Sequence, residues 1–130
     1  MVYLLDTNTV IAVLNDPSGP VATTLKTRRT EDVAVSSILL HELYYGAFKS
    51  QRLERNVALV DGLLFEILNF DPADAREAGQ IRATLALAGT PIGPYDVLLA
   101  GQARCRDLTL VTDNEREFSR VPNLKLENWL

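Results

Sequence analysis

The chain has 130 residues, of which 47% are hydrophobic and 23% are charged, with 7 glycines and 6 prolines. This length is typical of one domain of about 100 to 150 residues, and this composition excludes a disordered or fibrous protein. No apolar run reaches the roughly 18 residues that a membrane helix needs, and Asp6 interrupts the first apolar run before it could act as a signal peptide. We therefore expect one domain over residues 1–130 and a cytoplasmic protein.

Cysteine and histidine are scarce. Cys105 and His41 are the single residues of their types, which excludes an internal disulfide and any zinc site that needs several cysteines or two histidines. The net charge is −4, from 13 basic and 17 acidic residues, whereas nucleic-acid-binding domains are commonly basic. Carboxylates and hydroxyl groups are therefore expected to carry any chemistry, and bound divalent cations would reverse the local field around clustered carboxylates.

The first half of the chain alternates between strand and helix patterns. Residues 1–6 form an apolar run typical of a strand buried on both faces, and a helix is expected to begin near Thr9. Residues 33–36 predict a second strand, and a helix with an apolar face begins at Ser37. Residues 52–64 show the pattern of a further amphipathic helix.

The second half continues this alternation. Residues 65–70 predict a strand, and residues 71–88 predict the clearest helix, with an Asp-Pro pair at its start and a glycine after its end. Residues 94–104 form a helix pattern that is apolar nearly all round, which predicts burial against the sheet and another helix. Residues 107–112 are a second strongly apolar strand, and residues 124–126 are a weaker fifth strand candidate.

Strands that alternate with helices of about 10 to 18 residues imply right-handed crossovers. We therefore predict an α/β fold with a mainly parallel central sheet and helices on both faces. In such folds, ligands bind at the carboxyl ends of the strands, where the winding of the sheet reverses. Acidic residues at strand ends are therefore the candidates for function.

Four carboxylates occur at such positions. Asp6 and Asp113 follow the two most apolar strands, whereas Glu42 and Asp96 stand in the first turns of two predicted helices. Each of them alone is explained equally well by a helix cap, a turn or a solvated helix face. Together they would repel one another, and a bound hard cation is the usual way to keep such groups ionised. Oxygen ligands with open water positions suit Mg²⁺ or Mn²⁺, the cations of phosphodiester hydrolysis.

These residues and their flanks resemble a PIN-domain ribonuclease and, more narrowly, the VapC toxins of bacterial VapBC toxin–antitoxin pairs. The resemblance covers essentially the whole chain and implies a three-layer α/β/α sandwich. It also implies a Mg²⁺-dependent endoribonuclease, with Mn²⁺ as the alternative cation, that inhibits translation. Any one similar segment is a weak signal, but their order and spacing together are specific. The similar segments are residues 4–8, 36–46, 93–96, 111–114 and 117–118.

Carried onto this sequence, the resemblance assigns Asp6, Glu42 and Asp96 to three acids of the catalytic site, with Asp6 and Asp96 as the direct metal ligands. The fourth acid is Asp113, with Glu117 as its rival. The mechanistic hypothesis is that a metal-held water attacks an RNA phosphate in line while the carboxylates fix the metal and assist proton transfer. Supporting roles in orienting water, metal or phosphate fall to Asn8, Thr112 and Asn114.

The resemblance also implies partners. The substrate is RNA, with the anticodon stem-loop of tRNA favoured by analogy. A cognate VapB antitoxin neutralises the toxin by covering its active site with a C-terminal segment. A homodimer and a larger toxin–antitoxin assembly are expected, in which the antitoxin, and not this chain, reads DNA.

The sequence leaves two other functions as alternatives. A catalytically degenerate PIN fold would bind protein or RNA without cutting it, and metal-dependent RNA cleavage distinguishes the two cases. Residues 6–10 also resemble the nucleophile loop of haloacid-dehalogenase-type phosphatases, but Asn8 replaces the second aspartate of that loop and no Asp-Asp pair follows downstream.

Overall fold

The computed structural model describes all 130 residues, and five strands form one sheet in it. The strands stand in the order β3-β2-β1-β4-β5, and every neighbouring pair is parallel. The sheet therefore winds outward from β1 in two directions, and its winding reverses between β1 and β4. The bounds are β1 (Tyr3–Leu5), β2 (Val33–Ser36), β3 (Glu66–Leu68), β4 (Thr109–Val111) and β5 (Lys125–Glu127).

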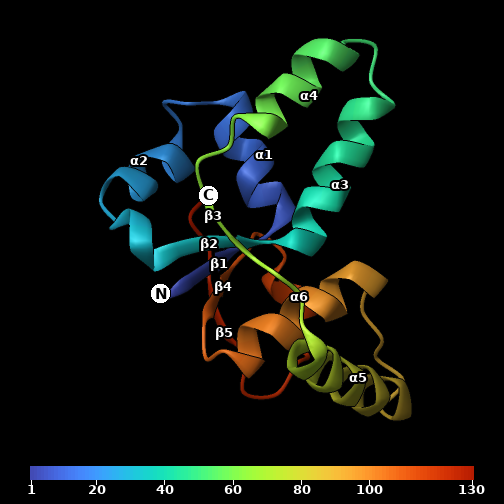
Figure 1. Ribbon diagram of the computed structural model, residues 1–130. Coiled ribbons are helices and arrows are strands. Elements are labelled where there is room, and N and C mark those ends of the chain that lie inside the picture. Colours follow the sequence, from blue (N-terminus) through green and yellow to red (C-terminus); the bar gives the residue numbers. More distant parts are fainter.

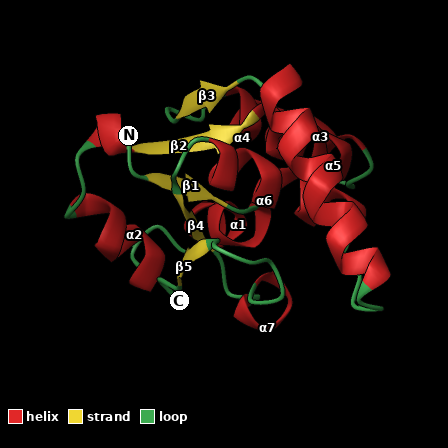
Figure 2. Cartoon of the chain, turned by 90° about the horizontal axis from the view of Figure 1, so that it is seen from below, coloured by secondary structure: helices red, strands yellow, loops and turns green.

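Helices cover both faces of this sheet, with α1 to α4 on one face and α5 to α7 on the other (Figures 1 and 2). The predicted three-layer α/β/α sandwich with a parallel sheet is therefore confirmed. None of the helices has the length and apolar character of a membrane span. Their bounds are α1 (Thr7–Asn15), α2 (Pro20–Lys26), α3 (Ser37–Phe48), α4 (Leu53–Asp61), α5 (Pro72–Leu87), α6 (Pro94–Cys105) and α7 (Glu115–Phe118), with a 3-10 turn at Thr30–Asp32.

The central strands divide their side chains between two apolar layers. On β1, Leu4 packs into the layer under α5 and α6, whereas its neighbour Leu5 packs into the layer under α1 and α3. On β4, Leu110 and Val111 divide in the same way. Successive strand residues point to opposite faces, so a strand covered on both faces must be apolar throughout. The core thus explains the continuous apolar runs in the sequence.

Several predicted elements are shorter in the structure than the sequence pattern indicated. The strand predicted over residues 107–112 begins only at Thr109, because Asp107 has a φ of 56° in the turn that follows α6. The helix predicted over residues 52–64 ends at Asp61, and Leu64 beyond it is 98% exposed. Two helices, α2 and α7, were not predicted from the sequence, because with 7 and 4 residues they are too short to display a helical period.

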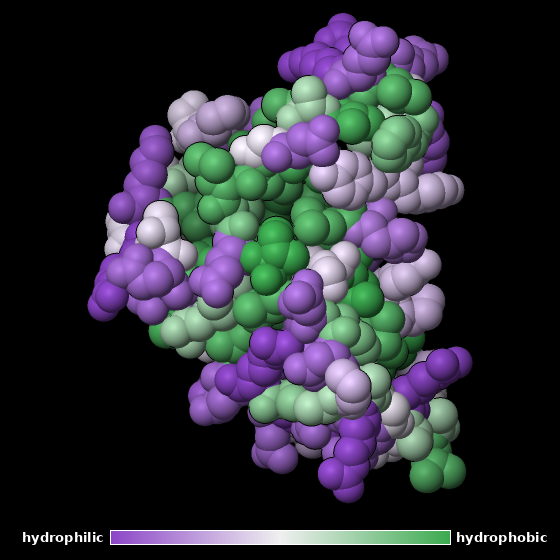
Figure 3. All heavy atoms as spheres, in the orientation of Figure 1, coloured by the Kyte–Doolittle hydropathy of each residue, from purple (hydrophilic) through white to green (hydrophobic).

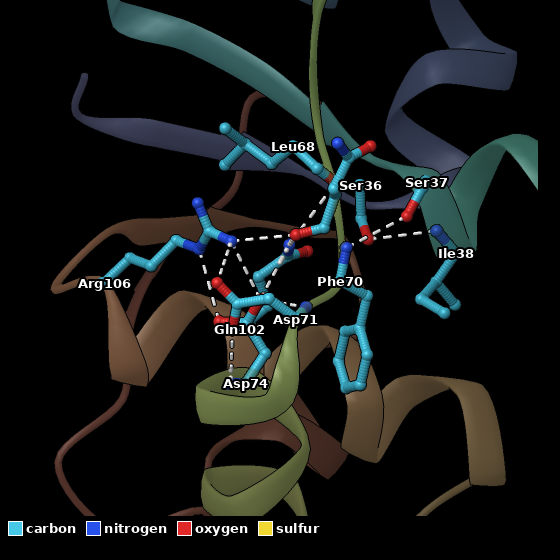
Figure 4. Close-up of polar contacts among 10 residues, drawn as sticks. Ser36, Ser37, Ile38, Leu68, Phe70, Asp71, Asp74, Gln102 and Arg106 are labelled. Carbon is cyan, nitrogen blue, oxygen red and sulfur yellow. Dashed lines mark hydrogen bonds and ion pairs between the residues drawn. The ribbon is translucent and has the colours of Figure 1, made fainter.

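A polar network fixes α6 against the segment that joins β3 to α5 (Figure 4). The carboxylate of Asp74, 1% exposed, accepts hydrogen bonds of 2.9 and 3.2 Å from the Arg106 guanidinium and one of 3.0 Å from the Asp71 amide. Arg106 also donates to the carbonyl of Asn69 at 2.8 Å. The end of α6 is thereby held, and so is the helix that carries Asp96 in its first turn.

Candidate active site

The four acids predicted from the sequence lie at the carboxyl edge of the sheet. Asp6 directly follows β1, and Asp113 lies two residues beyond the end of β4, on either side of the point where the winding reverses. Glu42 stands in the second turn of α3, which follows β2, and Asp96 stands in the first turn of α6. The fold therefore brings residues from four separate chain segments to one edge.

Asp6 is the most buried of these acids, with 6% of its surface exposed. It is the N-cap of α1, where its Oδ1 accepts a 2.9 Å hydrogen bond from the Thr9 amide, and its own amide donates to the Val111 carbonyl at 3.0 Å. Burial raises the pKa of Asp6, hydrogen bonds from Thr112 and Thr9 counteract part of that rise, and the charge of Asp113 adds to it. Capping of α1 accounts for an aspartate at this position, and the Asp6 carboxylate remains buried at the sheet edge next to the other acids.

Glu42 and Asp96 are half-buried, and the charge of Asp96 acts on Glu42. Burial raises the pKa of Glu42 first, the charge of Asp96 raises it further, and a hydrogen bond from the Thr7 side chain counteracts the rise. Burial likewise raises the pKa of Asp96, followed by the charges of Glu117 and Asp6. These charge effects place the acids in one electrostatic environment, since a negative charge makes a neighbouring carboxyl group harder to ionise.

The segment after β4 holds its polar side chains in a short hydrogen-bonded series. Thr112 is fully buried, and its Oγ1 accepts a 2.9 Å hydrogen bond from the Asn114 amide. The Asn114 side chain in turn donates to Glu117 Oε2 at 2.9 Å. Thr112 therefore orders the turn, and Asn114 orients the Glu117 carboxylate toward the site.

The two candidates for the fourth acid both reach the site, from different directions. Asp113 is exposed and acts on the pKa of Asp6, whereas Glu117 is half-buried and acts on the pKa of Asp96. Asn8, predicted to support the site, is exposed in the first turn of α1, and its side chain makes no hydrogen bond within the chain. It is free to contact a ligand.

Three residues to which the sequence assigned no role also shape the site. The Thr9 hydroxyl donates at 3.1 Å to the carbonyl at the end of β4, and the Thr7 side chain hydrogen-bonds to Glu42. A Cβ added at Gly93 would lie 3.0 Å from Asp96 Oδ2, so glycine leaves room for that carboxylate. The only signal in the sequence is that each of the three lies within three residues of a candidate acid.

The donor set fits a hard cation held partly by water. None of the five carboxylates pairs with a lysine or arginine side chain, so no ion pair of that kind within the chain neutralises them. No three histidine, cysteine, aspartate or glutamate side chains lie close enough together to hold one ion. The predicted carboxylates therefore do not surround one ion position in groups of three or more. Mg²⁺ is commonly held by one or two carboxylates with water at the other positions, which two of these acids can provide.

Comparison with known proteins identifies the family. Residues 3–124 match the PIN domain family model. The chain therefore belongs to the PIN domain family.

Relatives narrow this assignment. The chain is 44% identical over 129 residues to the tRNA(fMet)-specific endonuclease VapC of Salmonella typhimurium, over 98% of this chain and 97% of that protein. It is 41% identical to the ribonuclease VapC2 of Haemophilus influenzae, over 98% of each. The structure matches the DNA-bound VapBC crystal structure from Salmonella typhimurium with a TM-score of 0.95 at 43% identity, over 100% of this chain and 99% of that one. Within the PIN family, the chain is thus a member of the VapC ribonucleases, and neither alternative drawn from the sequence is favoured.

Proposed function

We propose that the protein is a Mg²⁺-dependent endoribonuclease that cuts tRNA in the cytoplasm and so inhibits translation, as the toxin of a toxin–antitoxin pair. The observation that carries this proposal is the set of buried and half-buried acids without a basic partner at the edge where the sheet winding reverses. The name of the Salmonella relative, an endonuclease specific for tRNA(fMet), supports tRNA as the substrate.

In this proposal, Asp6 and Asp96 hold the cation. The chemistry that a bound Mg²⁺ would supply here is activation of a water molecule and neutralisation of charge on the scissile phosphate. Glu42, whose pKa is raised by burial and by Asp96, accepts or returns a proton at its carboxylate. Asp113 or Glu117 supplies the fourth acid, and both are kept as candidates because each acts on a different proposed ligand.

The backbone supports phosphate binding at this edge. Helix α1 begins two residues after the end of β1, and α3 begins directly after the end of β2. Helix α6 carries the proposed ligand Asp96 in its first turn. Helix N-termini present unpaired amides and a partial positive charge, both of which favour an anionic phosphate. Exposed Asn8, in the first turn of α1, is placed to donate to the same group, and Thr112 and Asn114 keep the neighbouring segment ordered.

A VapB-type antitoxin is the proposed partner, because the structural relatives include VapBC complexes. An apolar groove of about 210 Å³ lies between α1, α3 and α4, where hydrophobic side chains gather on the face shown in Figure 3, and Glu42 is among its lining residues. A segment seated there reaches the acidic edge and covers it. The other groove residues include Ile11, Leu14, Leu43, Leu59 and Val60.

We propose a homodimer and a larger assembly with the antitoxin, in which the antitoxin contacts DNA.

Cleavage of total tRNA by the purified protein, with Mg²⁺ and with EDTA, tests the function. The matched variants are Asp6→Asn and Asp96→Asn, because asparagine also caps helices and so preserves the start of α1. The expected result is one discrete metal-dependent cut, mapped at nucleotide resolution, that both variants abolish while staying folded. If tRNA, mRNA and rRNA all survive the folded wild-type protein, the degenerate binding module replaces this proposal.

A further inference from the structure

Two aromatic rings lie side by side next to the proposed acids. His41 immediately precedes Glu42 on α3, and Tyr95 immediately precedes Asp96 on α6. The centroids of the two rings are 5.3 Å apart, and their planes are inclined by 52°. Because α3 and α6 cover opposite faces of the sheet (Figure 1), this ring pair joins the two layers at the acidic edge.

The ring pair is open to solvent. Tyr95 is 44% exposed and His41 is also exposed. Neither the Tyr95 hydroxyl nor the His41 imidazole makes a hydrogen bond within the chain. Aromatic pairs that only stabilise a fold are usually buried, since burial of their surface provides most of their energy. This pair instead keeps ring surface available for a ligand.

The negative charge of the acids next to the rings disfavours contacts with the phosphates of RNA. No arginine or lysine pairs with the neighbouring acids, and the chain as a whole carries a net charge of −4. These unpaired acids therefore repel a polyanion such as RNA at this edge. Stacking of a base on an aromatic ring does not depend on charge neutralisation and accepts every base.

We propose that His41 and Tyr95 form a stacking platform for one unpaired base of the RNA substrate, next to the phosphate that is cut. The inference rests on the proposed ribonuclease function and deepens it. A base within a double helix has its faces covered by its neighbours, whereas an unpaired base can be splayed out and stacked on aromatic side chains. The platform therefore directs cleavage to loops and single-stranded segments.

Steady-state cleavage of an RNA that the wild-type protein cuts provides the first test. We expect Tyr95→Ala and His41→Ala to lower kcat/KM by about five- to a hundredfold, chiefly through KM, because that is the usual range for loss of one stacked base. Tyr95→Phe, which keeps the ring, should retain activity near the wild-type level. The matched control is Tyr45→Ala, which removes a 61% exposed tyrosine of α3, the helix of His41, whose ring lies against Lys49. An equal loss in Tyr45→Ala, or a loss in Tyr95→Phe as large as in Tyr95→Ala, would overturn the platform.

A nucleotide scan gives the decisive second test. Abasic nucleotides are placed one at a time around the cut, and one position adjacent to the cleaved phosphate should lower wild-type kcat/KM to the level of Tyr95→Ala. At that position, the abasic change should cause no further loss in the variant, because both changes remove the same contact. If every position adds its full loss in the variant, the platform is wrong.

Direct titration with Mn²⁺ separates this inference from the proposed function. Tyr95→Ala and His41→Ala should bind Mn²⁺ as the wild-type protein does, since neither ring is a proposed ligand. Weakened Mn²⁺ binding in both variants would show that the rings support the acids and would overturn the platform. A wild-type protein that cuts no RNA and binds no Mn²⁺ defeats the proposed function itself, whereas an active protein without coupling in the scan defeats the platform alone.

Discussion

The hydroxyl of Thr9 donates a 3.1 Å hydrogen bond to the carbonyl of Val111, a residue 102 positions further along the chain. The same carbonyl accepts the amide of Asp6 at 3.0 Å, and the Thr9 amide caps back to the Asp6 carboxylate at 2.9 Å. These three contacts fix the start of α1 against the end of β4. They therefore set the position of the Asp6 carboxylate relative to the acids that follow β4.

Thr9→Val tests this relationship, because valine keeps the shape of the side chain and removes only the hydroxyl. The Val111 carbonyl keeps the Asp6 amide as a partner, so we expect a loss of about 1 kcal/mol in the free energy of unfolding, measured by urea denaturation. We also expect weaker Mn²⁺ binding, since Asp6 is held less firmly. Thr9→Ser keeps the hydroxyl and should bind Mn²⁺ as the wild-type protein does, although it loses some stability because it deletes a buried methyl group. Wild-type Mn²⁺ affinity in Thr9→Val would contradict a role for Thr9 in positioning Asp6.

The sequence predicted the features that depend on local patterns. The runs that became β1 and β4 are apolar because both faces of those strands are covered, and Asp6 and Asp96 could be located because each stands at a boundary between elements. Contacts between distant segments were not predictable, because nothing in the local pattern encodes which helix will face which. The pairing of His41 with Tyr95 is one such contact, and the hydrogen bond from Thr9 to β4 is another.

Two glycines that look alike in sequence differ in their surroundings. A Cβ added at Gly101 of α6 would lie 2.6 Å from both Cα and Cβ of Ala78 on α5, whereas a Cβ added at Gly79 meets nothing within 4 Å. Gly101→Ala must therefore push two packed helices apart, and we expect a loss of about 1 to 3 kcal/mol in the free energy of unfolding. Gly79→Ala should instead increase it by roughly 0.5 to 1 kcal/mol, because alanine is the better helix former.

Thermal and urea unfolding of both glycine variants check this pair. Their opposite signs control for any general effect of adding a methyl group to a helix. If Gly101→Ala is as stable as the wild-type protein, then α5 and α6 do not pack as closely as the structure shows. Because α6 carries Asp96, we further expect Gly101→Ala to lower RNA cleavage more than Gly79→Ala does.

The Asp74–Arg106 pair predicts a dependence of stability on acid. Burial alone would raise the pKa of Asp74, but hydrogen bonds from Arg106 and from the Asp71 amide outweigh it, and the net pKa lies below its ordinary value of 3.8. A lowered folded-state pKa contributes stability that is present above 3.8 and is lost as pH falls toward the folded value. We therefore expect the contribution of this pair to the free energy of unfolding to fall with acid in this range.

Asp74→Ala isolates that contribution. It leaves the Arg106 guanidinium and the Asp71 amide without their main partner, and we expect a loss of about 2 to 4 kcal/mol at neutral pH, measured by urea denaturation. The difference from the wild-type protein should shrink below pH 3.8, where the wild-type carboxylate is protonated in the unfolded state. The control is Arg29→Ala, which breaks the 2.6 Å ion pair between Arg29 and Glu31, two exposed side chains. This variant should have nearly the same free energy of unfolding as the wild-type protein. A loss in Asp74→Ala that does not vary with pH would show that packing, not charge, is responsible.

The acidic edge predicts the opposite dependence on pH. Burial raises the pKa of Asp6, Glu42 and Asp96, so the folded state holds their protons more tightly than the unfolded state does. Without a divalent cation, the contribution of these groups to stability is therefore most favourable at low pH. It falls as pH rises from the unfolded values of 3.8 and 4.5 through the higher folded values. A bound cation reverses the penalty, because it favours the ionised form.

Mn²⁺ should therefore raise the melting temperature more at pH 7.5 than at pH 4.5, as measured by differential scanning calorimetry. At a hundredfold excess over Kd, linkage gives about 2.7 kcal/mol of added stability at the higher pH. Asp6→Asn and Asp96→Asn should remove most of this gain. In the absence of metal, Asp6→Asn should unfold at a higher temperature than Asp6→Ala, because alanine also removes the cap of α1. Between Asp113→Asn and Glu117→Gln, the variant with the larger loss of Mn²⁺ stabilisation identifies the fourth acid. Equal stabilisation by Mn²⁺ at both pH values would rule out these carboxylates as the ligands.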